Sequence, residues 1–311
     1  MTTAPLLELV DASKTFRVKP MFGKAREVKA LREVSFSLET GQALALVGES
    51  GSGKSTIGRA VTRLFDLSGG QVKFRGRDIA SFAGRQDELT YLRSVQMVFQ
   101  DPFAALNPAH TVRHHLARPL KLHRKVSGSA LDAAVRQTLR DVELDPDTAI
   151  DKYPHELSGG QRQRINLARA LAVGAELIVA DEPTSMLDVS IRRSVLDLMR
   201  RLKTERQIAF LYITHDIATA QYIAERTAVM FAGQIVEWGP SSEIIADPRH
   251  PYTRVLLSSV PDPAVRFAAV AREGDPFTRE AARVRALARE PAGPAKEVSP
   301  GHFVRHVDFI T

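Results

Sequence analysis

Residues 43–56 read ALALVGESGSGKST, an apolar run that leads directly into a glycine-rich loop. Residues 48–55 fit the pattern G-x-x-x-x-G-K-[ST], and a helical run begins near Ser55. In this order, backbone N–H groups can surround phosphate oxygens at the positive end of the helix. The pattern predicts that Lys54 reaches the β- and γ-phosphates of a nucleotide and that the Ser55 hydroxyl binds Mg²⁺. A purely structural glycine turn would require neither side chain.

Two further apolar runs, residues 177–180 and 208–213, are also too short for ordinary helices and end in polar residues. Such runs are typical of parallel strands that helices cover on both faces. Helical stripes between and beside them are formed by Leu131, Val135, Leu139 and Val142, and by Val195, Leu198, Met199 and Leu202. We therefore predict an α/β fold whose ligand lies at the carboxyl ends of the strands.

The remaining segments differ from this core in composition. Residues 1–40 read as strands and turns and predict an N-terminal antiparallel β subdomain. Residues 101–165 contain a mostly helical insertion, which predicts a helical subdomain within a larger domain of residues 1–250. Residues 251–311 are interrupted by prolines and predict a small C-terminal module, appended to the main core. Within it, residues 277–287 have the spacing of an amphipathic helix surrounded by arginines.

Polar side chains follow the two later apolar runs. Asp181 comes directly after the first, where its carboxylate can hold a magnesium shell. Glu182 is the predicted general base, polarising a water towards the γ-phosphate. His215 follows the second run and can hydrogen-bond that phosphate. An Asp-Glu pair can also start a loop or cap a helix, and a lone histidine is often structural, so both roles depend on the neighbouring phosphate loop.

Composition excludes some classes of function. With 43 Lys and Arg against 36 Asp and Glu, the net charge is +7, but the arginines are dispersed, which favours a solvated basic surface over a nucleic-acid site. No run approaches the roughly 18 apolar residues that span a bilayer, and the N-terminus has no pattern of a secretory signal. The absence of cysteine excludes disulfides and thiolate metal sites. These features together predict a cytoplasmic protein.

A second glycine-rich stretch, LSGGQRQR at residues 157–164, immediately precedes a helix-like run. Together with GESGSGKST, MVFQDP, LIVADEPT, SMLD and ITHD, in this order along the chain, it resembles the ATP-binding subunit of an ABC transporter. The resemblance covers about residues 6–260. It implies a P-loop NTPase core of the ABC type, with ATP and Mg²⁺ as cofactors.

The resemblance also implies a role for each matching residue. The phosphate-binding loop comprises Gly48, Glu49, Ser50, Gly51, Ser52, Gly53, Lys54, Ser55 and Thr56. Asp181 matches the magnesium residue and Glu182 the catalytic glutamate. Gln100 matches a glutamine that senses the γ-phosphate and contacts the metal, and His215 matches the switch histidine. The remaining matches are Asp188, in a loop that reads SMLD where SALD is commoner, and Phe16, which stacks on adenine.

In this family two subunits bind head to tail, and each ATP lies between one subunit's phosphate loop and its partner's signature loop. Here the signature residues are Ser158, Gly159, Gly160 and Gln161. They fall where a helix would begin, so that Ser158 supplies a hydroxyl and the glycines permit close approach to the γ-phosphate. Two unlike glycine-rich loops in one chain therefore imply a working unit of two chains.

The C-terminal segments DPRHPYTRVLLSSVPDP and VSPGHFVRHVD resemble those of oligopeptide and dipeptide importer ATPases, in particular the F-type subunit. Such a subunit implies a D-type ATPase partner in a heterodimer, two membrane permeases and, indirectly, an extracytoplasmic binding protein, at the cytoplasmic face of the inner membrane. Many members hold an iron–sulfur cluster on cysteines here; this chain has none, and His302 and His306 cannot replace them, so we predict no cluster. Residues 250–253 are interpreted as diagnostic of the family rather than catalytic.

Two alternatives remain open from the sequence. A soluble ABC ATPase acting on nucleic acid or ribosomes would carry two cassettes, long heptads or a zinc module, none of which is visible. An importer for another solute, such as an opine, a nickel chelate or an oligosaccharide, would have the same ATPase motifs, because substrate is selected by other subunits. A non-hydrolysing regulatory subunit would lack Glu182 or an intact signature loop.

Overall fold

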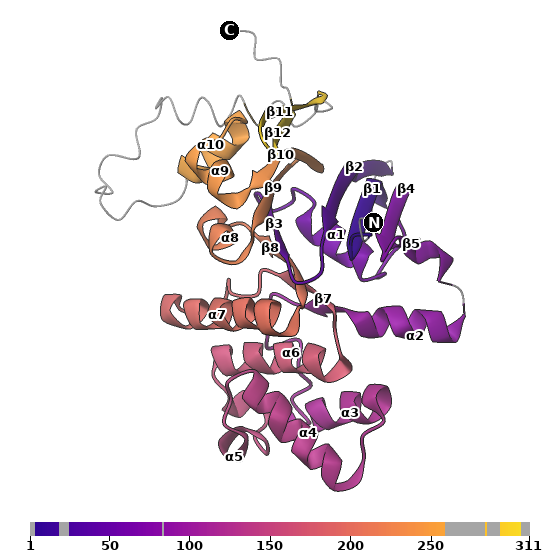
Figure 1. Ribbon diagram of the computed structural model, residues 1–311, viewed down its shortest axis with the longest axis vertical. Coiled ribbons are helices and arrows are strands. Elements are labelled where there is room, and N and C mark those ends of the chain that lie inside the picture. The colour runs from indigo at the N-terminus through magenta and orange to yellow at the C-terminus, as the bar shows by residue number, and fades with distance from the viewer. Residues whose placement is uncertain (1–3, 19–24, 83, 259–283, 285–292, 306–311) are drawn as a thin grey trace.

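The computed structural model describes residues 4–18, 25–82, 84–258, 284 and 293–305. Two sheets organise this part of the chain (Figure 1). One is a four-stranded sheet with the order β2-β1-β4-β5, and the other is an eight-stranded sheet with the order β11-β12-β10-β9-β3-β8-β7-β6. Helices cover the larger sheet, so the predicted α/β fold is confirmed.

Five neighbouring parallel strands form one side of the larger sheet and extend to its edge at β6. They are β9 (Arg226–Phe231), β3 (Ala43–Val47), β8 (Ala209–Thr214), β7 (Leu177–Asp181) and β6 (Val95–Val98). Every residue of β3, β7 and β8 is buried, as expected for strands covered on both faces. The three apolar runs are thus strands, within one residue of their predicted bounds. Because they are parallel, their carboxyl ends meet at one edge.

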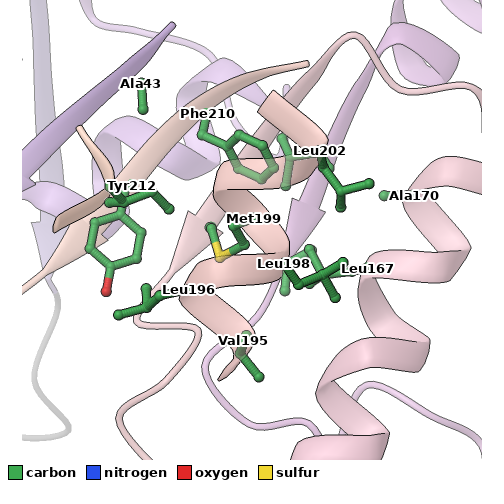
Figure 2. Packing of buried hydrophobic residues seen from close by; sticks show 14 of the residues in the cluster. Ala43, Leu167, Ala170, Val195, Leu196, Leu198, Met199, Leu202, Phe210 and Tyr212 are labelled. Atoms are coloured by element: carbon green, nitrogen blue, oxygen red, sulfur yellow. The ribbon is translucent and has the colours of Figure 1, made fainter. Parts of the chain in front are cut away.

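The sheet separates two hydrophobic clusters. Ala43, Ala45 and Val47 of β3 face the larger cluster, while Leu44 and Leu46 face the smaller one. This alternation follows from the period of two in a strand. On the larger side, α7 (Val189–Arg206) lies between β8 and α6 (Gly159–Val173), with Met199 and Leu198 among the side chains that fill the space (Figure 2). The stripe predicted at residues 195–202 is confirmed as a core-facing surface.

The N-terminal strands form the antiparallel sheet, as predicted. Its members are β1 (Leu7–Val18), β2 (Arg26–Leu38), β4 (Gly69–Phe74) and β5 (Arg77–Asp78). Alternate residues of β1, Leu7 and Leu9, are buried in the smaller cluster, which also contains Ile57 of α1 (Lys54–Val61). The antiparallel sheet therefore packs on the same face of the main sheet as the helix that follows the glycine-rich loop.

The predicted helical region is a group of helices away from the strands, in the lower part of Figure 1. It contains α3 (Val112–Arg124), α4 (Gly128–Asp141), α5 (Pro146–Ala149) and the N-terminal part of α6. Val135 and Leu139 of the predicted stripe are buried, and Leu131 packs partly buried against the same cluster. The sequence interpretation missed α2 (Arg85–Ser94), a helix of largely charged and polar residues.

The C-terminal segments are joined to the main core rather than standing apart from it. After β10 (Gln234–Pro240), α9 (Ser241–Ala246) packs against α8 (Ile217–Ile223). The next helix, α10 (Pro251–Ser258), contributes to the larger hydrophobic cluster. The hairpin of β11 (Ala295–Ser299) and β12 (His302–Arg305) extends the eight-stranded sheet beside β10. The described residues of α10 and of this hairpin therefore pack on the main core, and the appended module at residues 251–311 stays a prediction.

Two other predictions concern the C-terminal part of the chain. The division into residues 1–250 and 251–311 stays a prediction. The amphipathic helix predicted at residues 277–287 lies outside the described residues, apart from Val284, which is buried in the larger cluster. In the ranges that the structure describes, no helix has the length and apolar character needed to cross a membrane.

Candidate functional site

A cavity of about 950 Å³ lies at the carboxyl end of β3. Loop residues 49–51 and 53–56 line one part of it, and Gln100, Glu182 and His215 line another. The cavity also reaches β2 at residues 28–30. Residues that are far apart in sequence meet here because β3, β7 and β8 are parallel neighbours and end at the same edge. This is where a ligand of an open α/β sheet is expected.

The path of the loop depends on glycine at two positions. Gly48 has φ 156°, and a Cβ there would lie 2.2 Å from the Met230 carbonyl oxygen. Gly53 has φ 108°, and its Cβ would lie 2.6 Å from the Ala30 carbonyl oxygen. Any larger residue would have to displace backbone, so these two glycines let the loop pack tightly between β9 and β2 at the start of α1.

Lys54 is the first residue of α1 and points back into the loop. Its Nζ donates hydrogen bonds to the carbonyl oxygens of Gly48, at 2.6 Å, and Glu49, at 2.8 Å. Burial lowers the pKa of Lys54, while the nearby carboxylates of Glu182, Asp181 and Glu49 oppose this effect. The Lys54 ammonium adds its positive charge to that of the N-terminus of α1. This arrangement is typical of phosphate-binding sites.

Ser55 and Asp181 form the oxygen-rich part of the site. The Ser55 hydroxyl donates to Asp181 Oδ1 at 3.0 Å, and Asp181 is buried. Burial raises the pKa of Asp181, and the charge of Glu182 acts in the same direction. A hydroxyl and a carboxylate fit a hard cation such as Mg²⁺, which would offset the cost of burying this charge. Among the described residues, no three His, Cys, Asp or Glu side chains gather in a metal-binding cluster.

The Glu182 carboxylate lies between the two other predicted catalytic side chains. Gln100 Nε2 donates to Glu182 Oε2 at 3.0 Å, and His215 Nδ1 is 3.2 Å from the same oxygen. Glu182 itself has φ 46°, a left-handed conformation that costs energy for a residue with a side chain. The strain is held by its N–H, which donates to the Ile213 carbonyl oxygen at 2.9 Å. The structure thus brings together the predicted base and its two partners.

The signature residues lie outside this cavity. Ser158 is the N-cap of α6: its hydroxyl accepts from the Gln161 N–H at 3.3 Å, and its own N–H donates to Gln161 Oε1 at 3.0 Å. This capping box confirms that a helix begins at residues 158–161. Asp188 is the N-cap of α7 and is exposed. None of these residues lines the cavity that holds Lys54.

Phe16 is also outside the residues that line the cavity. Its ring meets the Phe65 ring edge-on at 5.4 Å, with the Lys14 ammonium 5.2 Å from its centroid. It is 37% exposed, and its strand neighbour across β1 and β2 is Val28, which does line the cavity. Stacking of Phe16 on adenine stays a prediction.

The structure gives a packing reason for glycine at position 160, which the sequence did not reveal. A Cβ on Gly160 would lie 2.4 Å from Ile191 Cγ2, and one on Gly159 would lie 3.2 Å from Leu187 Cδ2. The start of α6 is therefore pressed against the start of α7, and the second glycine permits this contact. The close approach fixes the signature residues relative to the loop at residues 185–188.

This contact predicts that Gly160→Ala destabilises the chain by about 1–3 kcal/mol, the usual cost of overpacking a tight contact. Urea unfolding monitored by circular dichroism measures the effect. In the double variant Gly160→Ala and Ile191→Ala, the space vacated by Ile191 is expected to restore part of the loss relative to Ile191→Ala alone. Equal destabilisation in both backgrounds would show that the contact with Ile191 is not the cause.

One contact to the loop was missed by sequence reasoning. Tyr252, in the stretch interpreted as merely diagnostic of the family, accepts a hydrogen bond from the Glu49 N–H at 2.7 Å. Leu256, one turn further along α10, lines the cavity. The motif His-Pro-Tyr-Thr at residues 250–253 was visible in the sequence, but nothing local indicates that α10 folds back against a loop two hundred residues earlier.

Comparisons with known proteins indicate the family of this chain. The family profile described as "ABC transporter" matches residues 31–185, and the profile "Oligopeptide/dipeptide transporter, C-terminal region" matches residues 236–283. The chain is 43% identical to the oligopeptide transport ATP-binding protein OppF of Streptococcus mutans over 302 residues, 96% of this chain and 94% of that protein. It is 40% identical to AppF, an oligopeptide transport ATP-binding protein of Bacillus subtilis, over 96% of each chain.

Solved structures show the same fold. The dimeric ATP-binding cassette MJ0796 in a post-hydrolysis state with ADP and Pi aligns with a TM-score of 0.66 and 27% identity, over 76% of this chain and 98% of that chain. CbiO1 of Clostridium perfringens, part of an ABC transporter complex, aligns with a TM-score of 0.67 and 23% identity, over 78% and 92%. The chain therefore belongs to the ABC transporter family, as one of the ATP-binding, ATP-hydrolysing subunits of its oligopeptide and dipeptide transporter branch.

Proposed function

We propose that this chain binds Mg²⁺-ATP at residues 48–56 and hydrolyses it to power the uptake of peptides, or of similar small solutes, through partner permeases. The observation that carries the hydrolytic part is the Glu182 carboxylate, held between Gln100 and His215 at the cavity that contains the Lys54 loop. The substrate class is supported by similarity to OppF and AppF over nearly the whole chain.

Each polar group has a distinct task in this proposal. Lys54 and the loop amides bind the β- and γ-phosphates. Ser55, Asp181 and Gln100 hold Mg²⁺, which when bound neutralises charge on the phosphates. Glu182 accepts a proton from the attacking water, and His215, 3.2 Å from Glu182, orients that carboxylate and contacts the γ-phosphate. Gln100 contacts Glu182 and belongs to the segment after β6, so it is placed to respond to both groups.

The partner across the nucleotide is proposed to be a second ATPase subunit, which this branch of the family supplies as a D-type chain in a heterodimer. Support comes from the placement of Ser158, Gly159, Gly160 and Gln161 outside the chain's own cavity. Apolar side chains are exposed in the adjoining loop and at the start of α7, with Met186 56% and Val189 81% exposed. An apolar, exposed loop beside the signature residues suits an interface that forms when ATP is bound.

The proposed permease contact lies beside Gln100. A second cavity, of about 550 Å³, is lined by Gln100, Asp181, Phe99, Pro119 and Arg169, between the sheet and the helical region. Phe99 is 46% exposed at this cavity and Phe103, nearby in sequence, is 56% exposed. This groove would receive a segment of one permease at the cytoplasmic face of the inner membrane. An extracytoplasmic binding protein would deliver the solute to the permeases.

Reconstitution tests the function as a whole. The chain, co-expressed with its permeases and companion ATPase and placed in lipid vesicles, is expected to accumulate a labelled oligopeptide in an ATP-dependent manner. Accumulation of an opine, nickel chelate or oligosaccharide instead would support the assignment as an importer but contradict the assignment of peptides as its substrate. Purification with ribosomes, without permeases, would overturn the transporter assignment.

The metal role of Asp181 has its own test. Asp181→Asn preserves the shape of the side chain and can still accept from Ser55, but it removes the charge, so the Mg²⁺ concentration needed for half-maximal ATPase activity is expected to rise on the order of tenfold or more. Because burial raises the pKa of Asp181, the nucleotide-free variant is expected to melt at a higher temperature. Asp197→Asn, on the exposed side of α7, is the matched control. An unchanged Mg²⁺ requirement would contradict the role.

A further inference from the structure

The Gly48–Glu49 peptide group is held from two sides. On one side its carbonyl oxygen, that of Gly48, accepts from Lys54 Nζ at 2.6 Å. On the other side its N–H, that of Glu49, donates to Tyr252 Oη at 2.7 Å. Because a peptide group is planar, fixing the N–H direction also fixes the direction of the carbonyl. The position of the Lys54 ammonium is thereby connected to a tyrosine hydroxyl on α10.

Tyr252 is itself firmly placed. The side chain is 1% exposed, and its ring packs on the Phe231 ring with centroids 4.4 Å apart. Phe231 ends β9, the strand that also brings the Met230 carbonyl against Gly48. Tyr252 therefore packs on the same end of β9 that lies against the loop. This packing leaves its hydroxyl little freedom to move away from the Glu49 N–H.

A buried charge holds the start of α10 in place. The Glu237 carboxylate, 0% exposed on β10, accepts from the N–H groups of Arg249, at 2.7 Å, and His250, at 3.0 Å. His302 Nε2, on β12, lies 2.8 Å from the same carboxylate. A buried carboxylate requires such partners, so Glu237 joins the C-terminal hairpin to the turn that begins α10.

His250 completes the turn. Its Nδ1 accepts from the Tyr252 N–H at 3.1 Å. Burial lowers the pKa of His250 to about 4, so the imidazole is neutral near pH 7 and keeps the lone pair that this contact requires. The stretch His250 to Tyr252 thus has a structural explanation: the histidine fixes the turn, the proline starts the helix, and the tyrosine reaches the loop.

We infer that Tyr252 is a positioning residue for ATP binding, through which the C-terminal region of the chain sets the conformation of the phosphate-binding loop. This inference rests on the proposed role of residues 48–56 in binding ATP. The hydroxyl does not touch the reacting atoms. It acts through the Gly48–Glu49 peptide, and so it governs how well the loop and Lys54 are arranged before nucleotide arrives.

Tyr252→Phe tests the inference, because it keeps the ring and its contact with Phe231 while removing the acceptor. Loss of one hydrogen bond that arranges the loop is expected to weaken the affinity of the full chain for both ATP and ADP by roughly twofold to tenfold. The kcat at saturating ATP is expected to be unchanged, since Glu182 and His215 are held by other elements. Hydrogen exchange at the Glu49 amide is expected to become faster.

Tyr222→Phe is the matched control, because that hydroxyl bonds to Asp197 on α7 and neither residue lines the cavity. It is expected to leave nucleotide affinity and the Glu49 amide unchanged. Wild-type affinity together with slow exchange at Glu49 in Tyr252→Phe would overturn the inference. If Lys54→Met loses ATP binding in the same experiments, the proposed function would stand. If the unaltered chain bound no ATP, both would fail.

Discussion

Glu182→Gln is expected to slow ATP turnover by about 10²–10⁴-fold, the range that a general base contributes, while leaving ATP binding in place. The amide is isosteric with the carboxylate and can still bond with Gln100 and His215, which lie 3.0 and 3.2 Å from Glu182 Oε2. It cannot accept a proton from water. The site would therefore keep its geometry and lose its base, so ATP would remain bound and hold two subunits together.

Single-turnover hydrolysis of radiolabelled ATP measures the rate, and light scattering after size exclusion measures the association of the ATPase subunits. Glu205→Gln is the control, since it makes the same change on the exposed surface of α7 and is expected to behave as the unaltered chain. Turnover within a few fold of the unaltered chain would assign the proton transfer to another group. In that case the strained backbone at Glu182 would need a different explanation.

Lys54→Met is expected to weaken ATP binding by on the order of 10- to 100-fold, from the loss of charged hydrogen bonds to phosphate. The methionine side chain is similar in length to the aliphatic part of lysine and is apolar. Because Lys54 is only 4% exposed, methionine can occupy the same buried space. The variant also loses the donor to the Gly48 and Glu49 carbonyl oxygens. Because those two carbonyl oxygens lose their donor, the loop is expected to lose some stability as well, while the larger effect appears in affinity.

Isothermal titration with ATP measures this change, and far-ultraviolet circular dichroism verifies that the fold is retained. Lys121→Met, on the exposed surface of α3, is the control. Unchanged affinity in a folded Lys54→Met chain would mean that the cavity does not bind the triphosphate in the way proposed here.

The central fold was predictable because its signals are local. Three short apolar runs without polar interruption indicated buried parallel strands. Asp181 and His215 lie at the ends of two of them, and Lys54 ends the glycine-rich loop that follows the third. Parallel strands that are neighbours in a sheet end at one edge, so the meeting of these residues followed from their position at strand ends. The Ser158 capping box was likewise readable, because its donors and acceptors are within three residues of each other.

What the sequence did not reveal depends on contacts between distant segments. The mutual contact of Gln100 and Glu182 spans 82 residues, and that of Glu49 and Tyr252 spans 203. The fit of Gly160 against Ile191 depends on how two helices cross. Prolines interrupt residues 251–311 and therefore predict an appended module, whereas the hairpin of β11 and β12 extends the main sheet. Composition registers such breaks in regular structure, but it contains no information about which sheet edge a later strand will join.

The central claim is that the two glycine-rich loops of this chain serve different nucleotides. Photo-crosslinking from position 186 tests it directly, because Met186 is exposed beside the signature residues and has no part in the chain's own cavity. In the Glu182→Gln background with Mg²⁺-ATP, Met186 replaced by p-benzoylphenylalanine is expected to link to the phosphate-loop region of another ATPase subunit. Mass spectrometry would identify that subunit as a companion chain or a second copy. Crosslinks confined to the chain itself, or equally abundant without nucleotide, would contradict the account.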